Sequence, residues 1–504
     1  MKQITLILFI LSSLSSFSQN PNYAEDVADI LYQNCTSCHH TGGIAPFPLM
    51  TYSEANSWGP QIVLETITGN MPPWPVDSTY QRYSHERILS LADITTLIDW
   101  NNNGRLQGDP TLTPTAPTYI AGATIPNPDY TLALPQYTSN ATTEDDYVCF
   151  SVQTSFASDM FIKAIEVLPG NPAIVHHALV FIDTSAIGAP ITTDCMGVDG
   201  KLVAGYTPGS NPAIFPNGGN IKMGVRLPAG ANIVVQMHYP EGSAGMIDST
   251  KVNFFFYPTG TTGVREVYTD PILKNWNLWI PPNTTPTFNA SYPANNGVLP
   301  YDFSILSVFP HMHLLGEEIT SYAVTGTNDT IPFERIKHWD FEWQGFYNFR
   351  NILKVPAGSR MYGTAKFDNT SGNPHNPNNP PVLVTAGEST TDEMFLIYFQ
   401  YLLYQQGDEN LNIDSLLNVS TAINETQFLP LEIYPNPSKD YITIQNAFES
   451  DFDITILDIL GKIVKKGTGV NSKQMISIAT LKAGKYICYI TSEGNIYSTK
   501  FIKN

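Results

Sequence analysis

The sequence predicts a multidomain, mainly β protein, with one small helical domain followed by three β-sandwiches. Three observations lead to this prediction. The chain has 504 residues, which is too long for a single domain. Helical periodicity marks residues 20–106. After them, short β-branched and aromatic runs alternate with turns rich in Gly, Pro and Asn.

The composition limits the classes of partner. A net charge of −19 makes nucleic acid an unexpected partner. Hydrophobic residues make up 42% of the chain, which is enough for several cores. No apolar run beyond the N-terminus reaches transmembrane length, so an integral membrane protein is not expected.

Residues 1–19 have the pattern of a secretory signal peptide. Lys2 precedes an apolar stretch at residues 4–11, and small polar residues follow it to a cleavage point near Ser18 or Gln19. A membrane anchor is the alternative interpretation of this stretch. Export would place the chain in an oxidising compartment, where disulfides form.

Residues 20–106 are predicted to form the small helical domain. The segment AEDVADILYQN before the first cysteine has apolar residues at helical spacing, and so does LADITTLIDWNNNG, which ends at an Asn/Gly stop signal. Residues 107–126 are rich in Pro and Thr and are expected to be a linker.

The helical domain contains the attachment pattern of a c-type haem. In Cys35-Thr36-Ser37-Cys38-His39, the two thiols can form thioether bonds to a porphyrin and the His can ligate the iron. A zinc half-site or a chance match is the alternative interpretation. We therefore expect a c-type cytochrome domain with one covalently bound haem c.

A second axial ligand is expected from the segment GNMPPWPVD. Met71 precedes two prolines that restrict the backbone, and a Met ligand suits an electron-transfer haem. The segment resembles the axial-ligand loop of cytochrome c domains fused to secreted bacterial enzymes. Met50 and His40 are the competing candidates, and core packing is the alternative role of Met71.

Two tandem β-sandwiches of jelly-roll-like type are predicted over residues 127–262 and 263–404. Runs such as NIVVQMHY, KVNFFFY, FSILSVF and EMFLIYFQYL are short, β-branched or aromatic, and bounded by turns. The length of this region suffices for two sandwiches. A second linker is expected at residues 405–430, where the alternation is lost.

Five of the ten histidines lie in three short apolar strings. The strings are AIVHHALVF with His176 and His177, VVQMHYP with His238, and VFPHMHLLG with His311 and His313. An imidazole without a partner is a poor filler of an apolar strand. A single His such as His238 is more often a core residue with a hydrogen-bond partner, but five together indicate metal ligands.

The strand period brings candidate ligands together. It places His311 and His313 on one face, about 7 Å apart along the strand. In DEMFLIYF it places Met394, Leu396 and Tyr398 on one face.

The adjacent His176 and His177 would point to opposite faces of a regular strand, so joint ligation requires a bulge or a strand end. The strings contribute imidazoles and a thioether, and no thiolate or carboxylate is expected as a ligand. This donor set favours copper over zinc or iron, and a soft Met ligand favours Cu(I).

The order HH, QMH, HMH and DEM resembles the copper type II, ascorbate-dependent monooxygenase family, from DDYVCF at residue 145 to QYL at residue 402. The resemblance implies two coppers in separate sandwiches, across a solvent-filled cleft. The copper that stores an electron would be held by His176, His177 and His238. The copper at which O₂ is activated would be held by His311, His313 and Met394.

The resemblance also bears on the substrate. Peptide-reading members of the family bind a carboxylate through an Arg, an Asn and a Tyr, at positions that are Phe309, Leu396 and Tyr398 here. Only Tyr398 is retained, and we expect it to act in catalysis together with His311, His313 and Met394. An unpaired carboxylate in a cleft is costly, so we expect a small, rather apolar substrate in place of a peptidylglycine.

The remaining cysteines have different expected roles. Cys149 in DDYVCF and Cys195 in TTDCMG match positions that form a disulfide in the family. The other disulfides of the animal enzymes are absent. Cys488 is expected to be a buried, small apolar residue rather than a reactive thiol.

Residues 431–504 are predicted to form a small Ig-like β-sandwich, because short strand signals recur along them. The segment resembles the C-terminal sorting domain of the type IX secretion system of Bacteroidetes, through YPNP at residues 434–437, GKY at residues 484–486 and KFIK at residues 500–503. The resemblance implies a secreted or cell-surface protein, exported through the periplasm of a Gram-negative bacterium by the type IX machinery. A carbohydrate-binding or adhesive sandwich is the alternative.

These features predict a secreted copper monooxygenase, an oxidoreductase that hydroxylates a C–H bond of a small molecule with O₂. The expected cofactors are two copper ions, one haem c, and ascorbate or another reductant as electron donor. The tethered haem could supply the electrons, at an effective concentration of about a millimolar. The alternative is a surface protein that binds copper and haem, or transfers electrons, without hydroxylating a substrate.

Overall fold

The computed structural model describes residues 20–43, 45–119, 124–184, 200–416, 428–444, 452–459, 461–469, 475–492 and 495–504. The predicted signal peptide, residues 1–19, and Cys195 lie outside these ranges. Strands dominate the described residues and form several separate sheets, which confirms the predicted multidomain, mainly β fold. None of the described helices is long and apolar enough to cross a membrane.

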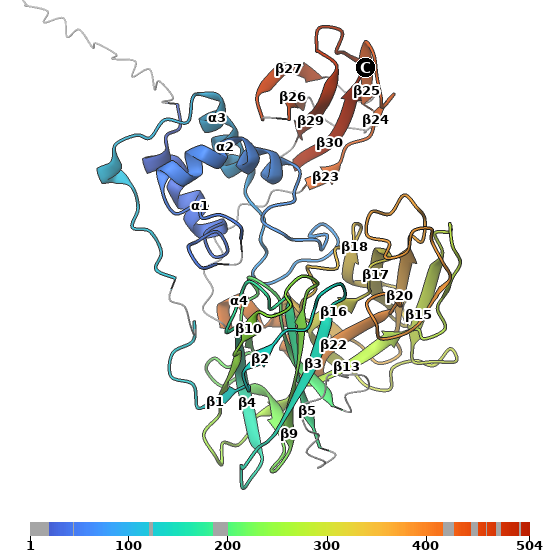
Figure 1. Cartoon of the computed structure of the whole chain (residues 1–504). Coiled ribbons are helices and arrows are strands. Elements are labelled where there is room, and N and C mark those ends of the chain that lie inside the picture. The colour runs from blue at the N-terminus through green and yellow to red at the C-terminus, as the bar shows by residue number, and fades with distance from the viewer. Residues whose placement is uncertain are drawn as a thin grey trace, which may run out of the picture.

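A helical body forms the N-terminal part (Figure 1). Its elements are η1 (Tyr23–Val27), α1 (Ala28–Asn34), α2 (Tyr52–Ile67), α3 (Leu91–Asn102) and η2 (Pro110–Leu112). Both predicted helical segments are therefore helical, and α2 adds a third, which begins at a capping box between Thr51 and Glu54. Val63, Leu97 and Trp100 are fully buried between the helices.

The first β unit packs two sheets across one core. The sheets have the orders β1-β11-β4-β8-β12, with β7 on β4, and β3-β9-β5-β6; β2 and β10 pair beside them. The strands are β1 (Tyr130–Ala133), β2 (Tyr137–Thr138), β3 (Asp146–Gln153), β4 (Met160–Leu168), β5 (His177–Asp183), β6 (Lys201–Tyr206), β7 (Ala213–Ile214), β8 (Met223–Leu227), β9 (Asn232–Tyr239), β10 (Ile247–Asp248), β11 (Lys251–Phe256) and β12 (Arg265–Glu266). Side chains from both sheets, such as Val180 and Phe254, share the core.

The second β unit repeats this plan. Its sheets have the orders β13-β22-β16-β19 and β15-β20-β17-β18, with the pair β14-β21. The strands are β13 (Tyr268–Lys274), β14 (Trp279–Ile280), β15 (Thr287–Tyr292), β16 (Phe303–His311), β17 (Gly316–Val324), β18 (Thr330–Ile336), β19 (Tyr347–Val355), β20 (Arg360–Phe367), β21 (Val384–Thr385) and β22 (Leu396–Leu403). Phe395, Ile397 and Phe399 face the core, so the residues that alternate with them face away from it.

The segment between α2 and α3 packs on the second β unit. Val76 and Tyr83 form isolated bridges with Ile336 and Phe349. Tyr83 is fully buried, and its hydroxyl donates to the carbonyl of Phe333 at 2.7 Å. Part of the chain predicted as cytochrome thus completes the core of a β unit.

A third two-sheet body ends the chain and lies beside the helices (Figure 1). Its sheets have the orders β23-β30-β29-β26-β27 and β24-β25-β28. The strands are β23 (Phe428–Pro430), β24 (Ile433–Tyr434), β25 (Tyr441–Ile444), β26 (Phe452–Asp458), β27 (Ile463–Gly469), β28 (Met475–Ser477), β29 (Gly484–Ser492) and β30 (Asn495–Lys503). Leu457 and Ile487 share the core of the helical body. Cys488 is a buried free cysteine, as predicted, and burial raises the pKa of its thiol to about 12.

The segment before this body also has structure. The short helices η3 (Asp408–Asn410) and α4 (Ile413–Leu416) follow β22. Asp408 pairs with Arg265 at 2.6 Å, and Ile413 lies in the core of the first β unit. These residues fall at the start of the predicted linker, and they fasten the two β units together.

Candidate metal centres

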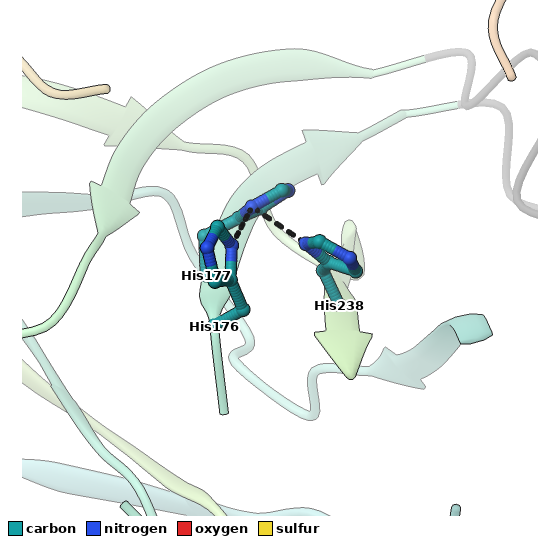
Figure 2. Close-up of side chains that lie close together, drawn as sticks. All are labelled: His176, His177 and His238. Atoms are coloured by element: carbon teal, nitrogen blue, oxygen red, sulfur yellow. Dashed lines mark hydrogen bonds between the residues drawn. The ribbon is translucent and has the colours of Figure 1, made fainter. Parts of the chain in front are cut away.

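Strand pairing brings His176, His177 and His238 together. His177 on β5 lies directly opposite His238 on β9. β5 begins at His177, so His176 lies outside the strand, and its amide donates to the carbonyl of His238 at 3.0 Å. The adjacent pair therefore occupies a strand end, one of the two backbone arrangements that joint ligation requires. Figure 2 shows the three rings turned toward one another.

The ring nitrogens of this three-histidine centre converge. The Nδ1 atom of His177 lies 3.4 Å from Nδ1 of His176 and 3.1 Å from Nδ1 of His238 (Figure 2). One ligand atom from each residue lies within 4.8 Å of the others. Nitrogens that share one metal ion at bonds of about 2 Å lie about 3 Å apart, so the spacing suits a single ion.

The surroundings favour the neutral form of His176 and His177. Burial, with the charge of His238 as a second cause, lowers the pKa of His176 to about 4. Burial and the neighbouring histidines hold the pKa of His177 well below its usual value. A neutral imidazole is the form that binds a metal. Asp145 Oδ2 lies 3.1 Å from Nε2 of His238, which leaves Nδ1 facing the other two rings.

A second centre begins at the end of β16. His311 is the last residue of this strand, and the rings of His311 and His313 lie 5.1 Å apart between centroids. Nδ1 of His311 donates to Oε1 of Gln344 at 2.5 Å, and Nδ1 of His313 donates to the carbonyl of Asp392 at 3.1 Å. Both Nδ1 atoms are therefore occupied, and the Nε2 atoms are left for a metal. Burial lowers the pKa of His311 to about 4 and that of His313 to about 3.

Met394 belongs beside these two residues. β16 and β22 pair His311 with Leu396, the last pair of the ladder, and His313 and Met394 each stand two residues beyond that pair. The amides of His313 and Met394 both donate to Oε2 of Glu393, at 3.0 and 3.2 Å. Glu393 is fully buried, and burial raises its pKa to about 8. This carboxyl group fixes the backbone of both residues.

One phenylalanine ring lies between the two centres. The centroid of Phe341 is 6.1 Å from that of His176, 6.5 Å from that of His238 and 6.1 Å from that of His313. The two β units also meet where the Tyr147 hydroxyl lies 3.1 Å from Thr390 Oγ1. The Phe341 ring therefore lies near ligands of both sets.

The positions predicted to contact substrate form an aromatic wall next to His311. Phe309 pairs with Tyr398 across the ladder, and their rings lie 5.8 Å apart. Phe346 stacks on Phe309 at 4.9 Å, and Leu396 is buried. Burial raises the pKa of the Tyr398 hydroxyl to about 12. The hydroxyl group is therefore protonated at neutral pH and can donate a hydrogen bond.

The residues of the attachment pattern fit a haem. Cys35 caps α1, and Cys35 and Cys38 are both free thiols. Nδ1 of His39 donates to the carbonyl of Phe47 at 2.9 Å, which leaves Nε2 for the iron. Burial lowers the pKa of His39, which favours the neutral ligand form.

The candidates for the second axial ligand stand in different surroundings. Met71 is 39% exposed, at the start of the segment that packs on the second β unit. Nδ1 of His40 donates to the carbonyl of Thr36 at 2.9 Å, and its ring stacks on Tyr119. The carbonyl of Met50 accepts from the Tyr32 hydroxyl at 3.0 Å. Met71 remains the predicted ligand.

The structure describes only one of the two cysteines of the predicted disulfide. Cys149 is 5% exposed on β3, opposite Gln236 on β9. Cys195 lies outside the described residues. The pairing stays a prediction.

Four residues around the centres were not identified from the sequence. Asp145 and Glu393 stand in the quoted strings DDYVCF and DEM, so attention to the acids in these strings could have found them. Gln344 and Phe341 lie in the loop between β18 and β19 and carry no periodic signal. Only the folded chain brings this loop to the histidines.

Two family descriptions match parts of the chain. Residues 272–416 match the copper type II ascorbate-dependent monooxygenase, C-terminal domain, and they include His311, His313 and Met394. Residues 432–504 match the secretion system C-terminal sorting domain. The findings support a copper monooxygenase domain followed by a type IX sorting domain, and with them a secreted or cell-surface oxidoreductase.

A curated relative agrees with the first match. Tyramine beta-hydroxylase of Caenorhabditis briggsae is 22% identical over 255 residues, which are 47% of this chain. The alignment covers 41% of the relative's length, so the chain spans about two fifths of that protein.

The similarity of the chain to solved structures is weak. The sulfur carrier protein SoxY from Chlorobium limicola f thiosulfatophilum has a TM-score of 0.13 and 12% identity, over 18% of this chain and 93% of that one. The β-glucuronidase of Ruminococcus gnavus in complex with D-glucuronic acid has a TM-score of 0.16 and 9% identity, over 43% of this chain and 36% of that one. Both scores are too low to indicate a shared fold.

Proposed function

We propose that the protein hydroxylates a C–H bond of a small, rather apolar molecule, R–H + O₂ + 2e⁻ + 2H⁺ → R–OH + H₂O, with copper at both centres. The observation that carries the proposal is the pair of facing ligand sets. Three imidazoles converge in the first β unit. In the second, the rings of His311 and His313 lie 5.1 Å apart and Met394 stands two residues beyond the end of the same ladder, within the residues that match the monooxygenase domain.

The donor atoms support one copper in each centre. Nδ1 atoms would hold the copper of the three-histidine centre, while Nε2 atoms and the Met394 thioether would hold the other. When bound, copper supplies one-electron chemistry and activates O₂. The chain's own part is to orient the ligands: Gln344 and the Asp392 carbonyl fix the tautomers of His311 and His313. Glu393 holds the backbone next to Met394.

The wall beside His311 supports an apolar substrate. Phe309, Phe346, Leu396 and Tyr398 offer rings, one aliphatic side chain and a single hydroxyl donor. No guanidinium stands at position 309 to pair with a carboxylate. The printed name of the curated relative refers to tyramine, and a small aromatic molecule would suit this wall.

We also propose how electrons reach the copper centres and how the chain is exported. A haem c held by Cys35, Cys38 and His39, with Met71 as second axial ligand, would supply electrons to the copper centres, with ascorbate or another reductant as the external donor. The chain would cross the periplasm before the type IX machinery secretes it. In that compartment Cys149 and Cys195 would pair, and a bond that closes so long a loop stabilises by roughly 2–4 kcal/mol.

An oxygen-uptake screen tests the proposal. The copper-loaded protein is mixed with ascorbate and a panel of small aromatic and aliphatic C–H substrates, and O₂ consumption is followed. We expect consumption that depends on both copper and one class of substrate. Copper binding without any substrate-dependent uptake, with ascorbate or dithionite, would support the alternative of a surface protein that binds copper and haem or transfers electrons.

A further inference from the structure

We propose that the turn at residues 207–210 of the first β unit is the docking site of the haem-carrying segment, and that electrons enter the copper domains there, toward the three-histidine centre. The inference rests on the proposed function, because it takes haem at Cys38 and copper at His176, His177 and His238. It adds which residues form the contact, by which route electrons travel, and which of the two centres is reduced first.

The contact joins Cys38 to Gly209. A Cβ atom built on Gly209 would lie 2.6 Å from Sγ of Cys38, closer than real Cβ atoms approach another atom. Gly209 also has a φ of +73°, in the left-handed region that favours glycine. The backbone of the first β unit therefore touches a thiol that would carry the porphyrin, and a side chain at position 209 would push the two apart.

Hydrogen bonds within the turn order its backbone. The amide of Ser210 donates to the carbonyl of Thr207 at 2.9 Å, and the amide of Thr207 donates to the Ser210 hydroxyl at 3.1 Å. From the segment between α2 and α3, the Arg87 guanidinium donates to the carbonyl of Gly209. A charged donor thus adds a second contact at the tip of the turn.

A short route leads from this turn to the three-histidine centre. The turn follows β6 directly, and Tyr206 at the end of β6 pairs with Ala178 on β5. Ala178 follows His177 in the chain. The route from Gly209 is therefore a few covalent steps and one ladder crossing, all inside a single sheet.

The route to the second centre crosses gaps between side chains in place of strand hydrogen bonds. A Cβ atom built on Gly205 of β6 would lie 3.8 Å from Phe346, whose ring stacks on Phe309 at 4.9 Å, and the Phe309 ring lies 6.3 Å from that of His311. A cavity of about 160 Å³ is lined by Thr207 of the turn and by Gln344, the partner of His311. A packed and hydrogen-bonded path carries coupling better than a gap, so the three-histidine centre should be reduced first. Each step moves one electron: the haem iron goes from Fe(II) to Fe(III) and copper goes from Cu(II) to Cu(I), with no proton transferred.

Gly209→Ala tests the contact, with Gly230→Ala as the matched control. Gly230 is in the same β unit and has a φ of +70°, but nothing lies within 4 Å of its added Cβ. Alanine imposes similar backbone strain at both positions and a clash only at Gly209. In anaerobic rapid mixing of reduced haem with oxidised copper, Gly209→Ala should slow haem oxidation by about tenfold or more, because small displacements strongly affect positioned reactants. Gly230→Ala should oxidise its haem at the parent rate.

Hydrogen exchange gives a readout that needs no copper. In the copper-free, haem-bearing protein, the amides of Thr207 and Ser210 should be protected. Gly209→Ala should lose this protection, and Gly230→Ala should keep it. Rapid exchange of both amides in the parent protein would show that the turn is not ordered, and it would overturn the proposed docking site even if a substituted chain failed to fold.

Ligand variants test the order of the centres. Without O₂ or substrate, His313→Ala should still oxidise its haem, whereas His176→Ala should not. Haem oxidation that persists in His176→Ala, or that proceeds at the parent rate in Gly209→Ala, overturns the inference. So does a parent protein whose haem never oxidises. Failure to hydroxylate any substrate with ascorbate, in a chain whose haem does oxidise, counts against the proposed function instead.

Discussion

The two candidate centres use the same side chain in opposite ways. In the first β unit, His177 and His238 face each other across β5 and β9, a backbone hydrogen bond joins His176 to His238, and the three Nδ1 atoms converge. In the second, Nδ1 of His311 and of His313 points outward to a protein oxygen. Backbone pairing therefore positions the residues of the first centre, whereas the second depends on a loop glutamine and on the segment before β22.

This difference suggests different chemical tasks. Three imidazoles held by backbone pairing would suit a stored electron, whereas the proposed Met394 thioether beside two imidazoles would favour Cu(I), the state proposed to activate O₂. The outer hydrogen bonds should consequently matter more at the second centre. Substitutions of these hydrogen-bond partners should therefore affect the second centre more than the first.

Met394→Leu should have the largest effect. Leucine keeps the size and apolar character of the side chain, so the free energy of unfolding should fall by less than about 1.5 kcal/mol. The second centre loses its soft ligand, so hydroxylation should drop by a factor of about a hundred or more while the three-histidine centre stays filled. Product formation and Cu(I) titration measure the two effects. Met361→Leu, in the core of the same unit, is the control, and equal activity in both variants would make Met394 a packing residue.

Gln344→Ala should weaken the second centre selectively. It removes the oxygen that accepts from Nδ1 of His311, and loss of such a partner typically costs about tenfold to a hundredfold in metal affinity. Competition with a copper chelator measures the affinity of each centre. Gln344→Glu restores an acceptor and should restore most of the affinity. A loss shared equally by both centres would contradict the asymmetry.

Asp145→Asn should have a smaller effect on the first centre. The substitution removes the negative charge 3.1 Å from Nε2 of His238 and keeps an oxygen in its place. Because the strand pairing of His177 and His238 remains, copper affinity there should fall by less than about tenfold. The same chelator competition gives the result, and a loss greater than that caused by Gln344→Ala at its own centre would reverse the comparison.

Glu334 should give the second β unit a pH dependence of its own. This residue is fully buried on β18, and burial raises its pKa from 4.5 to about 8. The folded chain therefore binds more protons than the unfolded chain between these values, and stability falls as the pH rises from about 4.5 to about 8. Glu393 has a raised pKa in the same range, so Glu334→Gln should reduce this slope without abolishing it, and it should raise the free energy of unfolding at pH 8 by at least about 1 kcal/mol. Denaturant unfolding across this range checks it, and an unchanged slope would assign the dependence to other groups.

Local patterns predicted much of this molecule. The run NIVVQMHY is β9 to the residue, and the helical segments before and after the attachment pattern are helices. Both depend on periodicity within a few residues, which a single sequence displays. Joint ligation by His176 and His177 required a bulge or a strand end, and the structure has the strand end.

Contacts between distant segments could not be predicted. Val76 and Tyr83 pack on the second β unit although their neighbours in sequence belong to the helical body. The loop that carries Phe341 and Gln344 reaches His311 and His313 within the second β unit, and Phe341 also lies near His176 of the first. Such contacts leave no period in the sequence. The ligand types could therefore be predicted, and Asp145 and Glu393 stood beside them, but Phe341 and Gln344 could not be predicted.

Incorporation of labelled oxygen tests the central claim most directly. Copper-loaded protein with ascorbate is supplied with isotopically labelled O₂ and with the substrate class that stimulates uptake, and the product is analysed by mass spectrometry together with the copper content of the chain. The account predicts two coppers per chain and one labelled oxygen atom in each product molecule. Two filled centres that yield only reduced oxygen and unaltered substrate would contradict it.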